Sequence, residues 1–169
     1  FNCSSFFHFE QPSDGIFGPN SFHFGAKFSF FTILRSNHLN SNEPIQFLSM
    51  VSDKKDILEF SIMNSQIVMN QKSPILNANN DSIFEEPPTQ FVTTTFSIKL
   101  NKNDKNESSI EFWNRIIIIV DCSQVKLCIN DNIEQANVSL NPFQSTEFTI
   151  KIGNGFIGDL SDIYFLNEV

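Results

Sequence analysis

The stretch FWNRIIIIVDCSQVKLCIN, residues 112–130, decides the fold of this chain. It holds the only tryptophan, five consecutive β-branched residues at 116–120, and a second run at 125–130 in which apolar and polar residues alternate. Two such runs around a short polar segment predict two antiparallel strands joined by a tight turn. Because the first run is apolar on both faces, we expect a central strand covered on both sides, with a half-exposed neighbour.

The chain has three cysteines, so at most one disulfide forms within it. If the hairpin turns at residues 123–124, Cys128 faces Ile119 across the ladder, and Cys122 and Cys128 lie on opposite sides of the sheet. A bridge from Cys3 to one of these two is the better prediction, with the remaining cysteine free or paired outside this chain.

The rest of the chain is a series of short apolar or alternating runs separated by turn residues. Strands are expected at residues 4–10, 21–25, 27–35, 45–51, 57–63, 66–69, 91–100, 133–140, 147–152 and 156–165. No segment has a helical apolar period, and no internal repeat is present. Many short strands with turn signals predict an all-β antiparallel sandwich of two sheets, with most of the 20 phenylalanines filling its core.

Length and charge narrow the class of protein. A chain of 169 residues is long enough for one domain, spanning residues 1–169, with a sizeable core. The net charge of −8 and the scattered lysines and arginines argue against a nucleic-acid partner. No apolar run approaches the roughly 18 residues of a membrane span. Because the chain starts without methionine, we expect a processed or excised piece, from which a signal peptide could have been lost.

Motifs for catalysis, metals and nucleotides are weak. The pattern G-x-G-x-x-G at residues 153–158 lacks the βαβ context of a dinucleotide site, because a strand is expected after it. His8 and His23 lie among phenylalanines and are interpreted as hydrogen-bonded sheet histidines. No zinc motif is present. The acidic residues lack the spacing of sandwich glycosidases, and alternation places Asp159 and Asp162 on opposite faces of one strand.

Candidate glycosylation sites are present in the chain. N-x-S sequons begin at Asn2, Asn80, Asn106 and Asn137. In a chain this rich in Asn and Ser, chance gives a similar number, so the sequons permit secretion without arguing for it.

Several segments resemble laminin G-like domains and their thrombospondin N-terminal-like relatives. Residues 113–130 resemble the W-x-x-[hydrophobic run]…V-x-L-x-V-[DN] hairpin of these domains, and residues 150–163 resemble their closing I-x-I-G…F-x-G-x-[IL]-x-x-[IV] signature. Upstream, residues 28–35 resemble the first long core strand and residues 56–60 the D-[YF]-L-x-L strand. The order and spacing agree over nearly the whole chain, and the closing segment is the most specific part.

The resemblance implies a concanavalin A-like jelly roll of roughly 12–14 strands, found in extracellular and cell-surface proteins. Such domains bind proteins, glycans such as heparin, and sometimes steroids, and they are not usually enzymes. Many hold one calcium ion at the rim, and Asp56 occupies the position of one ligand. The second ligand usually comes from the loop at residues 141–145, which here has no carboxylate, so a calcium-binding Asp56 and a bare surface Asp56 stay open. No other cofactor is implied, and the lack of a basic patch counts against heparan sulfate.

The sequence therefore predicts a non-catalytic extracellular recognition or adhesion domain. It would bind a protein partner through a sheet face or through rim loops, with Ser36–Pro44 and Gln71–Gln90 as the candidate loops. The alternatives are a lectin-like glycan binder, assisted by calcium or not, and a structural module of a larger ectodomain. A sandwich hydrolase or lyase would need two carboxylates about 5–9 Å apart on one concave face.

Overall fold

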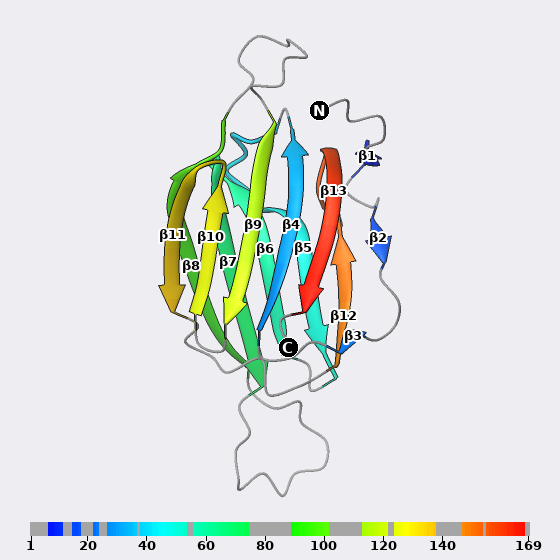
Figure 1. The fold of residues 1–169 in the computed structure, drawn as a ribbon, viewed down its shortest axis with the longest axis vertical. Coiled ribbons are helices and arrows are strands. Elements are labelled where there is room, and N and C mark those ends of the chain that lie inside the picture. Colours follow the sequence, from blue (N-terminus) through cyan, green and yellow to red (C-terminus); the bar gives the residue numbers. More distant parts are fainter. Residues whose placement is uncertain are drawn as a thin grey trace, which may run out of the picture.

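Two antiparallel β-sheets pack face to face as a sandwich (Figure 1). The computed structural model describes residues 7–11, 15–17, 22–23, 27–36, 38–53, 56–74, 89–101, 113–121, 124–137, 147–153 and 155–167. The predicted all-β sandwich is confirmed. Within these ranges, no helix has the length and apolar character needed to cross a membrane.

The six-stranded sheet, called sheet A below, has the strand order β1-β13-β4-β9-β10-β11. Its strands are β1 (Phe7–Phe9), β4 (Lys27–Arg35), β9 (Asn114–Asp121), β10 (Gln124–Ile129), β11 (Asn132–Asn137) and β13 (Gly158–Asn167).

The seven-stranded sheet, sheet B, has the order β2-β12-β5-β6-β7-β8, with β3 also paired to β12. Its strands are β2 (Ile16–Phe17), β3 (Phe22–His23), β5 (Ile45–Ser52), β6 (Ile57–Met63), β7 (Gln66–Pro74), β8 (Thr89–Lys99) and β12 (Glu147–Ile152).

The core lies between the two sheets and is rich in phenylalanine, as predicted. Its fully buried aromatic side chains are Phe28, Phe30, Phe47, Phe60, Phe96 and Phe156. Alternate residues of each strand point inward, so the aliphatic side chains of β9 and β10 interleave with these rings. Burial of each large apolar side chain contributes about 1.5–3 kcal/mol to folding.

The central hairpin forms as predicted, but its register differs by two residues. Cys128 faces Ile117, and not Ile119, because Gln124 joins the ladder opposite Asp121. A shift of two residues keeps every side chain on its predicted face. The alternation expected in β10 is accordingly confirmed, with Val125 buried and its neighbours on the other face accessible to solvent.

The expectation that β9 is covered on both sides is only half correct. Ile116, Ile118 and Val120 are fully buried against sheet B. Ile117 and Ile119 on the other face are only half-buried, and no described element packs over them. Among the described residues, sheet A therefore has an outer face that no second layer covers.

Two turns show why particular residues are needed. Asn64 and Ser65 have φ values of 51° and 62°, as in the type I′ turn that suits a two-residue hairpin. Gly153 has a φ of 79°, and a Cβ there would lie 2.2 Å from the Phe9 ring. The G-x-G-x-x-G pattern is thus the turn between β12 and β13, as the sequence indicated.

The long loop expected at residues 71–90 is shorter than predicted. β7 continues to Pro74 and β8 begins at Thr89, so both ends of that segment are strand. Residues 75–88 lie outside the described part of the chain.

Candidate functional site: the outer face of sheet A

A row of apolar side chains crosses the outer face of sheet A from β13 to β11. The register places Tyr164 beside Phe31, Phe31 beside Ile117, Ile117 beside Cys128, and Cys128 beside Ile133. Directly opposed residues of antiparallel strands point to the same side, so all five side chains lie on one face. The rings of Phe31 and Tyr164 are 5.9 Å apart between centroids.

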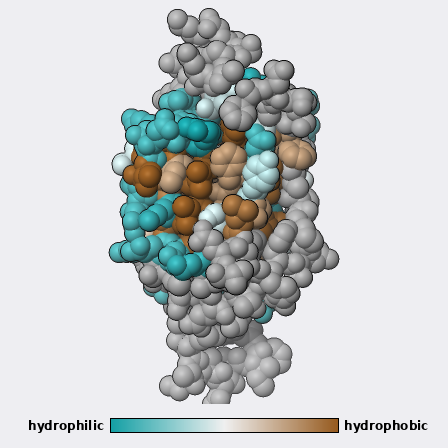
Figure 2. Space-filling model, viewed as in Figure 1, coloured by the Kyte–Doolittle hydropathy of each residue, from teal (hydrophilic) through white to brown (hydrophobic). Residues whose placement is uncertain are grey.

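Neighbouring positions widen this row into a patch, which we call the apolar face. Its members are Phe31, Ile33, Ile117, Ile119, Cys128, Ile133, Tyr164 and Leu166. Ile133, Leu166 and Tyr164 are 71%, 61% and 55% exposed, and the others are half-buried. Figure 2 shows the hydrophobic colour gathered in the middle of this view of the molecule.

The apolar face departs from the usual chemistry of an antiparallel sheet. One side of such a sheet normally packs on the core and the other is polar and solvated. Here β4 and β9 carry apolar residues on both sides. Exposed contiguous apolar patches in soluble proteins mark surfaces that contact other molecules.

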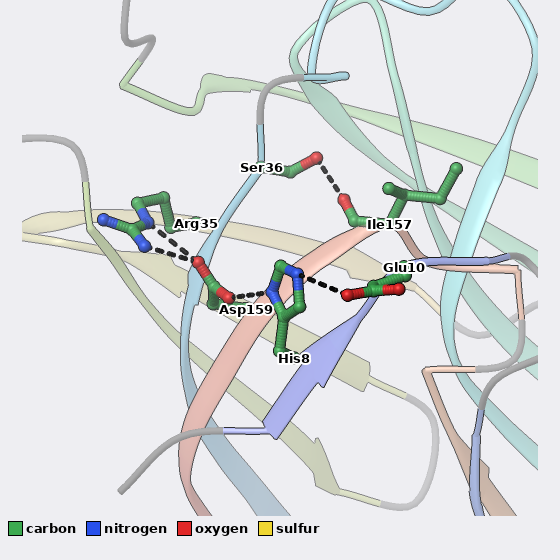
Figure 3. Close-up of polar contacts among 6 residues, drawn as sticks. All are labelled: His8, Glu10, Arg35, Ser36, Ile157 and Asp159. Carbon is green, nitrogen blue, oxygen red and sulfur yellow. Dashed lines mark hydrogen bonds and ion pairs between the residues drawn. The ribbon is translucent and has the colours of Figure 1, made fainter. Parts of the chain in front are cut away.

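Paired charges lie at one end of the apolar face, where Arg35 follows Ile33 on β4 and faces Asp159. Figure 3 shows the contacts among these charged side chains. The buried carboxylate of Asp159, on β13, accepts hydrogen bonds through Oδ2 from Nε and Nη2 of Arg35, at 2.9 and 2.6 Å. Its Oδ1 accepts a hydrogen bond from Nδ1 of His8 at 2.5 Å. Nε2 of His8 lies 3.9 Å from Oε1 of Glu10, and the Arg35 guanidinium lies 4.8 Å from the Trp113 ring centre.

This cluster links three neighbouring strands of sheet A, because His8 lies on β1, Asp159 on β13 and Arg35 on β4. The described polar partners of His8 are both carboxylates, so the contact offers no hydroxyl or thiol that the imidazole could activate. The prediction of a hydrogen-bonded sheet histidine is confirmed for His8. The side chain of His23 lies outside the described part of the chain.

Further ion pairs border the apolar face. Nη2 of Arg115 lies 2.9 Å from Asp131, and Nζ of Lys27 lies 3.1 Å from Asp121. These pairs place positive and negative charges together beside the apolar side chains. The border therefore carries charges of both signs.

Asp159 and Asp162 do not follow simple alternation. The register of β13 shifts between Ser161 and Tyr164, and Asp162 has a left-handed φ of 50°. Asp159 is buried against Arg35, whereas Asp162 is exposed. The bulge interrupts the alternation on which the prediction of opposite faces relied.

Asp56, the candidate calcium ligand, is buried next to two serines. Its Oδ2 accepts a hydrogen bond from Oγ of Ser52 at 3.3 Å, and its Oδ1 accepts one from Oγ of Ser73. Calcium takes six to eight oxygen ligands, and the described surroundings alone do not supply such a shell. Among the described residues, no three His, Cys, Asp or Glu side chains gather as a metal group. The loop at 141–145 lies outside those residues, so calcium at Asp56 stays a prediction.

The other predicted sites are only partly within the described residues. Those outside are Asn2, Asn80, Asn106, Cys3 and Cys122. Asn137 is exposed at the end of β11. The thiol of Cys128 is free and half-buried within the apolar face. The free thiol contradicts a bridge from Cys3 to Cys128, whereas a bridge from Cys3 to Cys122 joins two residues outside the described part and stays a prediction.

The candidate loop Ser36–Pro44 is fixed against the sandwich. Its Leu39 is buried, and the Leu39 carbonyl accepts a hydrogen bond from the backbone N–H of Ser65 at 2.6 Å. Oγ of Ser36 donates to the carbonyl of Ile157 at 2.5 Å (Figure 3). The structure does not bring this loop and the apolar face together into one site.

The sequence reasoning missed two features of the site. The first is the apolar face, although Phe31 and Ile33 occupy the outward positions of the stretch KFSFFTILR at 27–35 and could have indicated it. The second is the contact of Arg35 and His8 with Asp159, which no local pattern indicates.

Comparison with known proteins identifies solved structures that have the same fold. No protein-family model and no curated protein sequence matches the chain. Among solved structures, the LG1-3 region of the laminin alpha2 chain aligns with 90% of this chain at 10% identity and a TM-score of 0.56. Domains LG4-5 of the mouse laminin alpha1 chain align with 86% at 13% identity and a TM-score of 0.54. A family 7 alginate lyase aligns with 88% at 11% identity and a TM-score of 0.49.

The chain has the fold of the laminin LG domains, a concanavalin A-like sandwich. It spans 30% and 36% of the two laminin structures, about a third of their length. Identities this low show a shared fold and say nothing about shared ligands. The resemblance predicted from the sequence is confirmed at the level of the fold.

Proposed function

We propose that this domain is a non-catalytic recognition module that binds a protein partner through the apolar face of sheet A. The apolar face itself carries the proposal, because it is the contiguous apolar surface that the described residues leave uncovered. We also propose that the domain acts outside the cell or at the cell surface, as the resemblance to laminin G-like domains implies.

The chemistry of the apolar face suits a protein better than a sugar or a polyanion. Tyr164 on β13 and Phe31 on the adjacent strand β4 supply neighbouring rings toward the β13 end of the apolar face, and aromatic residues are frequent energetic anchors of protein interfaces. The surrounding ion pairs, such as Arg115 with Asp131, resemble the polar rim of such an interface. A standard interface buries about 800 Å² on each partner, and apolar burial contributes about 25 cal/mol per Å².

The proposal can be tested with single substitutions that place a charge on the apolar face. Tyr164→Lys and Ile133→Lys change exposed side chains and should leave the fold intact. The labelled domain and each variant would be screened against the same panel of purified cell-surface and secreted proteins. We expect both variants to lose a partner that the unchanged domain binds saturably, because a desolvated ammonium opposes apolar docking.

Asn42→Lys is the matched control, because it adds the same charge at an exposed position of the loop Ser36–Pro44. It should retain binding. Loss of binding in Asn42→Lys with retention in Tyr164→Lys would place recognition at the rim loops and overturn the proposed site.

The lectin alternative is tested separately on a glycan array, in calcium and again in EDTA. Saturable binding to one glycan class that survives Tyr164→Lys would show that the domain recognises glycans at a site other than the apolar face. Loss of that binding in EDTA and in Asp56→Asn would assign a calcium ion to the rim.

A further inference from the structure

The edges of the two sheets are unequally protected. A free edge exposes unpaired backbone N–H and C=O groups, which natural proteins guard with short strands, charges and bulges. In sheet A, β1 has 3 residues, and β11 has 6 and carries Glu134. In sheet B, β2 and β3 have 2 residues each, whereas β8 at the opposite edge has 11.

The C-terminal part of β8 is protected against pairing with another strand. The pairing of β7 with β8 shifts in register between Gln66 and Val68, where β8 bulges. Oε2 of Glu134 accepts hydrogen bonds from the backbone N–H groups of Ser97 and Ile98, at 2.7 and 3.1 Å. Lys99 then ends the strand.

The N-terminal part of β8, Thr89–Thr95, lacks the bulge, the bound carboxylate and the charged residue of the C-terminal part. Its sequence TQFVTTT contains no charge and no proline. The side chains of Phe91, Thr93 and Thr95 are exposed, and Phe91 is 64% accessible. Within the described part of the chain, this segment pairs with β7 on one side and with no strand on the other.

We propose that the free edge of β8 pairs antiparallel with β8 of a second copy of this chain, across a twofold axis at Thr93. The two seven-stranded sheets would then continue as one sheet through the dimer. Addition of a strand to an exposed edge satisfies backbone hydrogen bonds, whereas the side chains decide which strand is accepted.

The sequence of the segment favours its own copy as the added strand. About this axis, Thr93 faces the second copy's Thr93, Val92 faces its Thr94, and Phe91 faces its Thr95. Threonine pairs and aromatic–β-branched pairs are favourable across antiparallel strands. A symmetric pairing places identical residues close together at the axis, so any charge there would repel its own copy. This segment contains no charged residue, so that repulsion does not arise.

Phe91 is the side chain that the proposed dimer would bury most. Its ring is exposed on the outer face of sheet B, with Nζ of Lys72 at 5.7 Å from the ring centre. The second copy's Thr95 would cover the other side of the ring, and Lys72 would stay at the solvent side. The dimer thus removes the most exposed aromatic side chain among the described residues from water.

The test is the molar mass of the 169-residue chain by sedimentation equilibrium and by light scattering over a wide range of concentration. We expect a concentration-dependent dimer. Thr93→Lys and Thr93→Glu should each be monomeric, because each opposes its own charge at the axis. An equimolar mixture of the two should recover the dimer, because lysine then faces glutamate.

Gln135→Lys, exposed on β11, is the matched control and should remain dimeric. Circular dichroism and thermal unfolding would show that all variants are folded. An unchanged chain that stays monomeric, a dimeric Thr93→Lys, or a mixture that fails to recover the dimer would each overturn the inference.

This inference is independent of the partner-binding role of sheet A. Tyr164→Lys should leave the dimer unchanged. Dissociation by Tyr164→Lys but not by Thr93→Lys would show that copies meet through the apolar face, and the edge pairing would be wrong.

Discussion

Glu134 and Ser97 join the two sheets along one side of the sandwich. A single carboxylate oxygen, Oε2 of Glu134 on β11, accepts hydrogen bonds from both the backbone N–H and the hydroxyl of Ser97 on β8, each at 2.7 Å. Ser97 lies in the bulged part of β8, where the ladder with β7 shifts and gives this residue no register partner. One side chain of sheet A thus completes the hydrogen bonding of an edge strand in sheet B.

Loss of this carboxylate should loosen that side of the sandwich. We expect Glu134→Ala to lower the free energy of unfolding by about 1–3 kcal/mol, because donors on Ser97 and Ile98 lose a charged acceptor. Urea denaturation followed by tryptophan fluorescence would measure the change. Asn132→Ala, at an exposed position of the same strand, should change stability by less than about 0.5 kcal/mol. Equal effects of the two substitutions would contradict this role of Glu134.

Arg35 neutralises the buried carboxylate of Asp159. Arg35→Met should destabilise the domain by about 3 kcal/mol, because the buried carboxylate of Asp159 loses its permanently charged partner and keeps only the exposed His8 among the described residues. His8→Ala should cost less than about 1 kcal/mol, since His8 is exposed and the pair with Arg35 remains. A double-mutant cycle with Asp159→Asn should show that the double variant is more stable than the sum of the single effects predicts. Additive effects would mean that Arg35 acts through packing on Trp113.

Position 153 requires glycine for two reasons: its φ is positive, and the Phe9 ring occupies the space that a Cβ would need. Gly153→Ala would combine a φ of 79° with a Cβ at 2.2 Å from the Phe9 ring, and Gly155→Ala would have a φ of 98° with its nearest contact at 3.5 Å. Both changes carry a backbone penalty of about 1 kcal/mol, so the difference between them measures the clash. We expect Gly153→Ala to be more destabilising by at least about 1 kcal/mol in thermal or urea unfolding. Equal losses would show that Phe9 moves aside freely.

Cys128 reports on occupancy of the apolar face, because its free thiol is half-buried between Ile117 and Ile133 of that surface. A bound protein partner should slow alkylation of Cys128 by N-ethylmaleimide, since docking excludes the reagent. Mass spectrometry of the peptide that contains Cys128 distinguishes it from Cys3 and Cys122. Binding without any protection of Cys128 would place the partner elsewhere on the domain.

Local patterns in the sequence predicted much of the secondary structure. The bounds of the strands at 27–35, 57–63 and 147–152 are those expected from alternation and turn residues. The hairpin within residues 112–130 also formed, with a register two residues from the predicted one, and the tight turn at Asn64 formed as predicted, because hydrophobic period and turn chemistry act over a few residues. Strands that begin or end at bulges or weakly patterned segments, such as β7 and β8, were predicted less well.

The sequence alone determined which side chains share a face, where the main turns lie, and that phenylalanine fills the core. Only the tertiary structure decided what lies over each face. Alternation assigns Ile117 and Ile119 to one side of β9, but whether another layer covers that side depends on the order of strands in both sheets. For the same reason, the contact of His8 with Asp159, 151 residues apart in the chain, follows from the pairing of β1 with β13 and from no local pattern.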